Sequence, residues 1–115
     1  MVIRELLIGE EPPYELLLMA DPSIEMINKY LGKGECFVAE KGGQIIGVYV
    51  LLPIDSDKVE LINIAVSENY QGRGIGKQLV LDAINTARKK GFKTIEVGTG
   101  NSSIGQLALY QKCGF

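Results

Sequence analysis

Histidine is absent from this chain of 115 residues, and cysteine occurs only twice, at Cys36 and Cys113. The lack of histidine removes the most common general base and the most common metal ligand of proteins. The two cysteines are far apart and show no ligand-like spacing, so we expect two unpaired thiols rather than a disulfide. Acid–base chemistry would have to come from carboxylate or phenol side chains, and we expect no metal site.

Long apolar runs and a strong net charge are also missing. No run approaches the roughly 18 residues of a membrane span, and the N-terminus has no signal pattern, so we expect a cytoplasmic protein that does not engage membranes. A net charge of -2 and a pI near 5.1 argue against a nucleic-acid partner, although not against a small anionic ligand. The length and the 46% hydrophobic content are those of one globular domain, here residues 1–115.

The first half of the chain has the patterns of three strands and two short helices. Asp21 and Pro22 separate the helical patterns, and we expect Asp21 to cap the second helix with Pro22 in its first position. Gly42 and Gly43 supply the positive φ values of a tight hairpin. The expected elements are a strand at Ile3–Ile8, helices at Tyr14–Ala20 and Pro22–Leu31, and strands at Cys36–Glu40 and Ile45–Leu52.

The second half predicts a strand at Val59–Val66, a long amphipathic helix at Ile75–Lys90 and a strand at Lys93–Val97. The three central strands follow one another as an antiparallel meander, whereas the last strand–helix–strand unit implies a parallel pair with a right-handed crossover. Gly91 is suited to end the long helix, and 104–112 has the pattern of a final helix. The expected fold class is α/β with a mixed sheet.

The stretch Gln71–Lys77, at the start of the long helix, does not fit an isolated helix. The positive end of a helix dipole favours Asp or Glu, and a misplaced cation costs about 0.3–1 kcal/mol. Here Arg73 and Lys77 occupy this place, and Gly72, Gly74 and Gly76 weaken the turn. An anion bound at the helix end would reverse these penalties, because glycines let backbone N–H groups approach a phosphate closely.

Two common glycine motifs are excluded. A P-loop would need glycine at position 71 and Ser or Thr after Lys77, but Gln71 and Gln78 stand there. A dinucleotide fingerprint beginning at Gly72 would need a third glycine where Lys77 stands. The pattern that fits is Q-x-x-G-x-G at Gln71, Gly74 and Gly76, and with it the chain resembles the GNAT superfamily of acyl-coenzyme A-dependent N-acyltransferases.

Two further stretches extend this resemblance. Val59–Val66 is similar to the central fourth strand of the family, and 108–115 (ALYQKCGF) is similar to its closing L-Y-x-x-x-G-F signature. The resemblance implies a mainly antiparallel sheet with a parallel pair at the cofactor site. Family members usually add two strands after this signature. We expect the domain to be C-terminally truncated, to obtain these strands from a partner, or to close without them. Each version leaves a sheet edge and the last helix under-covered, which favours association, for example as a homodimer, or marginal stability.

The resemblance also assigns roles to individual residues. Acetyl-coenzyme A would be the donor, with its pyrophosphate on the loop, its pantetheine arm along the strand end and Asn101 as a hydrogen-bonding partner. Glu60 corresponds to the general base, and its strand parity places it with Ile62, Ile64 and Val66, whereas Tyr110 corresponds to the general acid. The expected cofactor-binding residues are Ile64, Ala65, Val66, Gln71, Gly72, Arg73, Gly74, Ile75, Gly76, Lys77 and Asn101.

Three functions remain open on the sequence. The leading one is an N-acetyltransferase that transfers acetyl directly to a primary amine, either of a small molecule or of a protein. A non-catalytic acyl-coenzyme A-binding module would keep the glycine loop without needing Glu60 or Tyr110. In an assembly domain, the glycine loop itself would be incidental. Four acids near the early helices could favour a cationic acceptor, although solvated helix-start residues explain them as well: Glu10, Glu11, Asp21 and Glu25.

Overall fold

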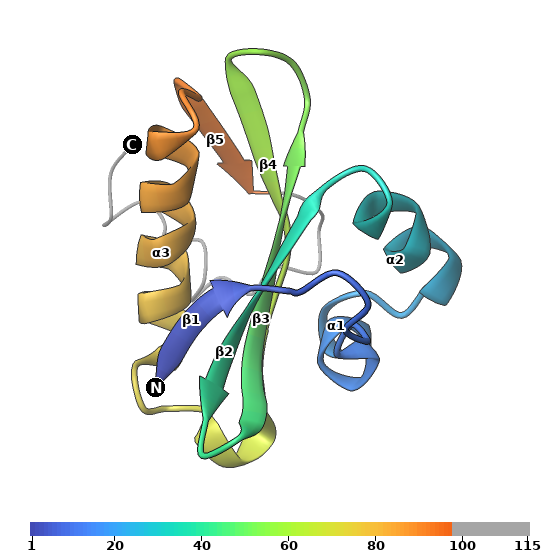
Figure 1. Cartoon of the computed structure of the whole chain (residues 1–115), viewed down its shortest axis with the longest axis vertical. Helices are drawn as coiled ribbons and strands as arrows, with labels where there is room; N and C mark the ends of the chain where they lie inside the picture. Colours follow the sequence, from blue (N-terminus) through green and yellow to red (C-terminus); the bar gives the residue numbers. More distant parts are fainter. Residues whose placement is uncertain (98–115) are drawn as a thin grey trace.

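The computed structural model describes residues 1–97, which form one mixed sheet with helices on both faces (Figure 1). The five strands lie in the sheet in the order of the sequence, and each neighbouring pair is antiparallel except β4 and β5, which are parallel. The elements are β1 (Val2–Glu5), α1 (Tyr14–Ala20), α2 (Ile24–Leu31), β2 (Glu35–Lys41), β3 (Gln44–Pro53), β4 (Lys58–Val66), the 3-10 turn η1 (Glu68–Tyr70), α3 (Ile75–Lys89) and β5 (Thr94–Val97).

This architecture confirms the expected fold class, the antiparallel meander of β2, β3 and β4, and the parallel pair joined through α3. Gly91 has the expected left-handed conformation after α3, with a φ of 89°. The final helix that the pattern at 104–112 predicts lies outside the described residues.

The sheet separates two buried cores. α3 covers one face and the pair α1 and α2 covers the other (Figure 1). Because side chains alternate along a strand, Tyr49 and Leu51 of β3 pack on the α3 side, whereas Val48 and Val50 pack on the side of α1 and α2. Each face of β4 therefore presents its side chains to a different set of helices.

The first strand ends earlier than the apolar run Ile3–Ile8 predicts. β1 stops at Glu5, and the Leu7 and Ile8 side chains are exposed. The Glu10 carboxylate accepts a hydrogen bond from the Leu7 N–H at 2.9 Å, which turns the chain away from the sheet. A local side-chain contact therefore overrides the apolar pattern.

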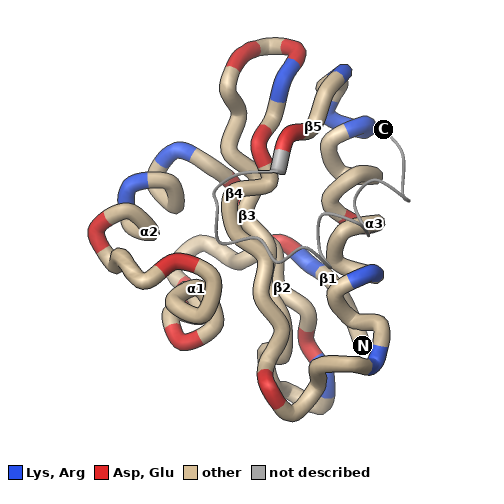
Figure 2. The backbone as a smooth tube through the Cα atoms, turned by 180° about the vertical axis from the view of Figure 1, so that it is seen from behind, with Lys and Arg blue, Asp and Glu red and all other residues tan. Residues whose placement is uncertain are grey.

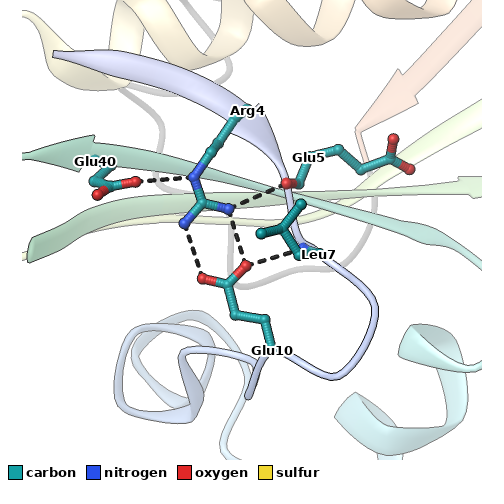
Figure 3. A network of polar contacts seen from close by, with 5 residues as sticks. All are labelled: Arg4, Glu5, Leu7, Glu10 and Glu40. Carbon is teal, nitrogen blue, oxygen red and sulfur yellow. Dashed lines mark hydrogen bonds and ion pairs between the residues drawn. The ribbon is translucent and has the colours of Figure 1, made fainter. Parts of the chain in front are cut away.

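Arg4 anchors this turn to the sheet. Its guanidinium donates two hydrogen bonds to the Glu10 carboxylate, at 2.9 and 2.8 Å, and one to Glu40 of β2 at 2.9 Å (Figure 3). The bidentate contact lowers the pKa of Glu10 to about 2, with a further contribution from the Leu7 N–H. The segment that leads into α1 is thus held against β1 and β2.

The cap of α2 differs from the expected one. Ser23 occupies the N-cap position, and its hydroxyl accepts a hydrogen bond from the Met26 N–H at 3.2 Å. Asp21 instead accepts hydrogen bonds from the Ser23 N–H at 3.0 Å and from the Tyr30 hydroxyl at 3.3 Å. The prediction of Asp21 as cap was wrong because α2 begins at Ile24, which leaves Asp21 and Pro22 outside the helix.

A β-bulge interrupts β4 at Ile62. Leu61 lies opposite Leu51 of β3, but Asn63 lies opposite Val50, so Ile62 has no partner of its own. Such an extra residue bends a strand and reverses the alternation of its side chains. Before the bulge, the odd-numbered residues of β4 therefore face the α3 side, whereas after the bulge the even-numbered residues do.

The bulge corrects the expected orientation of Glu60. Leu61 and Ile64 both pack on the α3 side, although an odd number of steps separates them, whereas Ile62 packs on the side of α1 and α2. Glu60 precedes the bulge and alternates with Leu61, so it shares the face of Ile62. The expectation that it also shares a face with Ile64 and Val66 was wrong, because sequence parity does not register a bulge.

Candidate active site

The loop between β4 and α3 folds back onto the end of β4. The Gln71 side-chain amide donates a hydrogen bond to the Val66 carbonyl oxygen at 3.0 Å, which closes the loop. Gly72 and Gly74 have φ values of 77° and 80°, a left-handed conformation that side chains other than glycine rarely adopt. The glycines at these two positions are thus required by the path of the backbone.

α3 begins without the usual protection of a helix start. Gly74 is its N-cap, no side chain caps the first turn, and no acidic residue lies in that turn. The first N–H groups of a helix have no partner within the helix, and the dipole adds partial positive charge there. Arg73 and Lys77 are both exposed beside this end, and the Arg73 guanidinium lies over the Tyr70 ring at 5.3 Å.

Gly76 tests whether the chain leaves room for a ligand at this helix start. Its backbone has ordinary helical φ, so its conformation does not require glycine. A Cβ atom built on Gly76 would meet only Cγ2 of Val66, at 4.0 Å, so internal packing does not require glycine either. The open approach, the backbone donors and the two cations together fit a diphosphate such as that of coenzyme A.

The end of β4 leads directly into this loop. Ile64 and Val66 pack on the α3 side, and Ala65 packs on the side of α1 and α2. The described pairing of β4 with β5 reaches Leu61, which lies beside Val97, the last described residue. The expected splay of the two strands beyond that point lies outside the described part of the chain.

Glu60 lies in the first half of β4, between Leu52 of β3 and Glu96 of β5. Partial burial raises the pKa of its carboxyl above the ordinary value, and the nearby Glu96 carboxylate raises it further. Glu96 forms an ion pair with Lys58 at 3.4 Å. A carboxylate with a raised pKa is a stronger base than an ordinary one, which suits the removal of a proton from an amine.

Two of the expected site residues lie outside the described residues. They are Asn101, expected to bind the cofactor, and Tyr110, expected to act as the general acid. The structure therefore brings together Glu60, the end of β4 and the glycine loop along one strand and its continuation, and the roles of the other two stay predictions.

The sequence analysis overlooked Asn63, which is 2% exposed and supports this part of the site. Its amide N–H groups donate hydrogen bonds to the Tyr30 hydroxyl at 2.8 Å and to the Leu17 carbonyl oxygen at 3.0 Å, whereas the side-chain carbonyl oxygen of Asn63 has no partner among residues 1–97. Asn63 thereby ties β4 to both α1 and α2. The available signal was a lone amide within the apolar run Val59–Val66.

Residues 1–97 contain no group of three or more His, Cys, Asp or Glu side chains that could hold a metal ion. They also contain no helix with the length and apolar character of a membrane span. Cys36 is buried and unpaired, and Cys113 lies outside this range.

The mixed sheet, its parallel pair β4 and β5, and the uncapped, cationic start of α3 at the end of β4 define the class of the protein as an α/β domain with an open, positively charged helix start. Residues 3–115 match the model of the acetyltransferase (GNAT) family. The chain therefore belongs to the GNAT acetyltransferase family.

The relatives share most of the chain. The N-acetyltransferase YvbK of Bacillus subtilis (strain 168) is 58% identical over 111 residues, which cover 94% of this chain and 72% of that protein. A GNAT family acetyltransferase from Elizabethkingia anophelis with acetyl-CoA bound has a TM-score of 0.92 at 51% identity, covering 99% of this chain and 74% of that one. A Bacillus subtilis acetyltransferase in complex with CoA has a TM-score of 0.86 at 56% identity, covering 97% and 74%.

Proposed function

We propose that this chain is an N-acetyltransferase that moves an acetyl group from acetyl-coenzyme A to a primary amine by direct transfer. The observation that carries the proposal is the uncapped start of α3, where backbone N–H groups, Arg73 and Lys77 surround an open approach over Gly76. The coenzyme A and acetyl-CoA bound to two solved relatives support the same donor. No step of this proposal uses a metal ion.

The donor would bind along β4 and its loop. The N–H groups from Gly72 to Lys77 would donate to the pyrophosphate, with Arg73 and Lys77 adding charge, and Gln71 would hold the loop closed. The backbone of Ile64–Val66 would position the pantetheine arm, and Asn101 would add a hydrogen bond. When bound, acetyl-coenzyme A supplies the activated thioester acyl group.

Glu60 would make the acceptor reactive. An alkylamine with a pKa near 10 is mostly protonated at pH 7, so its ammonium must lose a proton before the nitrogen can form the new C–N bond. The Glu60 carboxylate would accept that proton directly or through water. As the C–S bond breaks, Tyr110 would donate its phenol proton to the departing sulfur, and the second proton that the acylated nitrogen must lose would pass through water and restore the phenol.

Calorimetric titration with coenzyme A tests the donor site. We expect saturable binding to the unmodified chain, with thermal stabilisation at the same concentrations. An absence of any binding would refute the assignment of the loop. This measurement does not depend on knowing the acceptor.

The pH dependence of turnover tests Glu60. Because its pKa is raised, kcat/KM should fall at a higher pH than an unperturbed glutamate would give as the pH is lowered. Glu60→Gln should remove most turnover, and Glu96→Gln should move the acidic limb to lower pH because a like charge is lost. If Glu60→Gln and Tyr110→Phe both keep full turnover and still bind coenzyme A, neither residue takes part in the proton transfers.

The non-catalytic binding module makes a different prediction. It would bind coenzyme A with normal affinity but release no thiol with any amine, and Glu60→Gln would change neither result.

We further propose that residues 1–115 act as one domain. Gel filtration with light scattering would test whether the chain forms a homodimer.

A further inference from the structure

A small pocket opens between α2 and the sheet, on the face to which Glu60 belongs. Its volume is about 120 Å³, and its lining is apolar, although two lysines contribute to it. Lysine can line such a wall with its methylene groups while its ammonium stays in water at the rim. The lining residues are Met26, Lys29, Tyr30, Lys33, Leu52 and Ile62.

The pocket adjoins the candidate base. Leu52 of β3 is the direct cross-strand neighbour of Glu60, and the alternation of both strands puts the two side chains on one face. Cross-strand neighbours have Cβ atoms about 4.5–5.5 Å apart. Ile62, the bulged residue, forms the next part of the wall. An amine bound at Glu60 would therefore carry its substituent into this pocket.

The wall of the pocket is fixed from behind. The Tyr30 hydroxyl accepts a hydrogen bond from the Asn63 amide at 2.8 Å and lies 3.3 Å from the Asp21 carboxylate, to which it donates. Tyr30 is only 3% exposed, so its ring is held between α2 and the sheet. The apolar floor exists without a ligand, and binding need not order it.

The charges at the pocket are positive. Lys29 and Lys33 are exposed, and neither makes an ion pair within residues 1–97. Of the acids that could have favoured a cationic acceptor, Glu10 is held by Arg4, and Asp21 is bonded to Ser23 and Tyr30. None of the lining residues in the described part of the chain is an acid, and the nearest carboxylate that the strand pairing brings to the pocket is the candidate base Glu60. Figure 2 shows the basic segments of α2 and of the turn that follows it.

We propose that this pocket is the acceptor subsite and that the acceptor is a small primary amine with an apolar side chain and a carboxylate, as in a free apolar amino acid. The inference rests on the proposed acetyl transfer. The apolar group would enter the pocket, the carboxylate would bind Lys29 and Lys33, and the amine would face Glu60. A cavity of roughly 150 Å³ accommodates benzene, so this open pocket of about 120 Å³ suits a smaller apolar group such as a leucine side chain.

Matched amines test the two features separately. Thiol release would be measured with leucine, leucinamide and glycine, because leucinamide lacks the carboxylate and glycine lacks the apolar group. We expect kcat/KM for leucine to exceed that for each of the others by about tenfold or more, in line with one charge-assisted contact or one buried side chain. Leucinamide is the less basic amine, so a larger fraction of it is neutral and reactive at pH 7. A preference for leucine would therefore arise against this difference in basicity.

Variants then assign the contacts. Lys29→Gln combined with Lys33→Gln should lower kcat/KM for leucine about tenfold and leave leucinamide unchanged. Lys89→Gln is the matched control, since Lys89 lies in the last turn of α3 as Lys29 does in that of α2. Met26→Trp, at an exposed position, should fill the pocket and lower turnover of leucine but not of glycine.

The outcomes separate the two proposals. If leucinamide or a polyamine is acetylated best and the lysine variants have no effect, the inference fails while acetyl transfer stands. If no amine releases thiol, the proposed function fails, and calorimetry with leucine and leucinamide in the presence of coenzyme A decides the pocket. Lysine-dependent binding of leucine alone would then support the subsite, and equal or absent binding of the two would overturn it.

Discussion

The starts of α2 and α3 solve the same physical problem in opposite ways. α2 begins with Ser23 bonded to the Met26 N–H and with Glu25 in its first turn, so its own side chains satisfy its positive end. α3 begins with Gly74, no side-chain cap, no acid in its first turn and two nearby cations. The difference indicates that the side chains of α2 bind the N–H groups at its own start, whereas the start of α3 leaves its N–H groups available to an external anion.

The largest expected effect comes from giving α3 the acid that it lacks. Gly76→Asp should weaken coenzyme A binding roughly 100-fold, because a carboxylate would occupy the approach of the pyrophosphate and repel it. The ligand-free protein should be as stable as before or more so, since Asp suits a helix start and replaces glycine. Calorimetry and thermal melts measure the two quantities.

A neutral variant of similar size separates charge from volume at this position. Gly76→Asn should weaken coenzyme A binding much less than Gly76→Asp does. Equal losses in the two variants would mean that space, and not charge, governs the site. Unchanged binding in both would contradict the role of this helix start.

Removing the cations beside α3 should have a smaller effect. Arg73→Gln and Lys77→Gln should each weaken coenzyme A binding by about three- to tenfold, with larger losses at low salt because the groups are exposed. Titrations at two salt concentrations measure this. Lys89→Gln, at the other end of α3, is the control and should change little; an equal loss there would indicate a general effect of net charge.

The cap of α2 should matter for stability alone. Ser23→Ala should lower the free energy of unfolding by about 1 kcal/mol, because the Met26 N–H loses its partner. Affinity for coenzyme A should not change. Ser67→Ala is the matched control, since Ser67 precedes η1 without a side-chain cap bond, and urea unfolding should show little change for it.

The smallest effect is expected at Tyr70, whose ring lies 5.3 Å from the Arg73 guanidinium and 5.8 Å from the Lys41 ammonium. Tyr70→Leu should weaken coenzyme A binding by less than about threefold, because an exposed cation–π contact contributes about 0.5–1 kcal/mol to holding Arg73. In the Arg73→Gln background the change should vanish. A loss that persists there would assign Tyr70 a contact of its own.

Regular periodicity made much of the fold predictable. The stripe of apolar side chains that begins at Ile75 fixed α3, and the alternation in the central runs fixed the meander. The glycine pattern at Gln71–Lys77 also indicated the loop, because positive φ at Gly72 and Gly74 is a local property of the backbone. Local rules suffice wherever neighbours in sequence determine the structure.

The remaining features depend on contacts that sequence spacing does not carry. The bulge at Ile62 arises from how β4 pairs with β3, and it decides whether Glu60 shares a face with Ile64 and Val66. Asn63 binds groups on α1 and α2 that are 46 and 33 residues away. The pocket beside α2 has the same origin, since α2 and two strands build it together.

The sequential strand order also sets an order of assembly. The hairpin of β2 and β3 and the pairing of β3 with β4 involve short chain separations, whereas β1 meets β2 only after the chain has passed through α1 and α2, and β5 meets β4 only after it has passed through α3. Closing a longer loop costs more entropy and slows pairing. We therefore expect the meander of β2, β3 and β4 to form early in folding and the two outer strands to join it later.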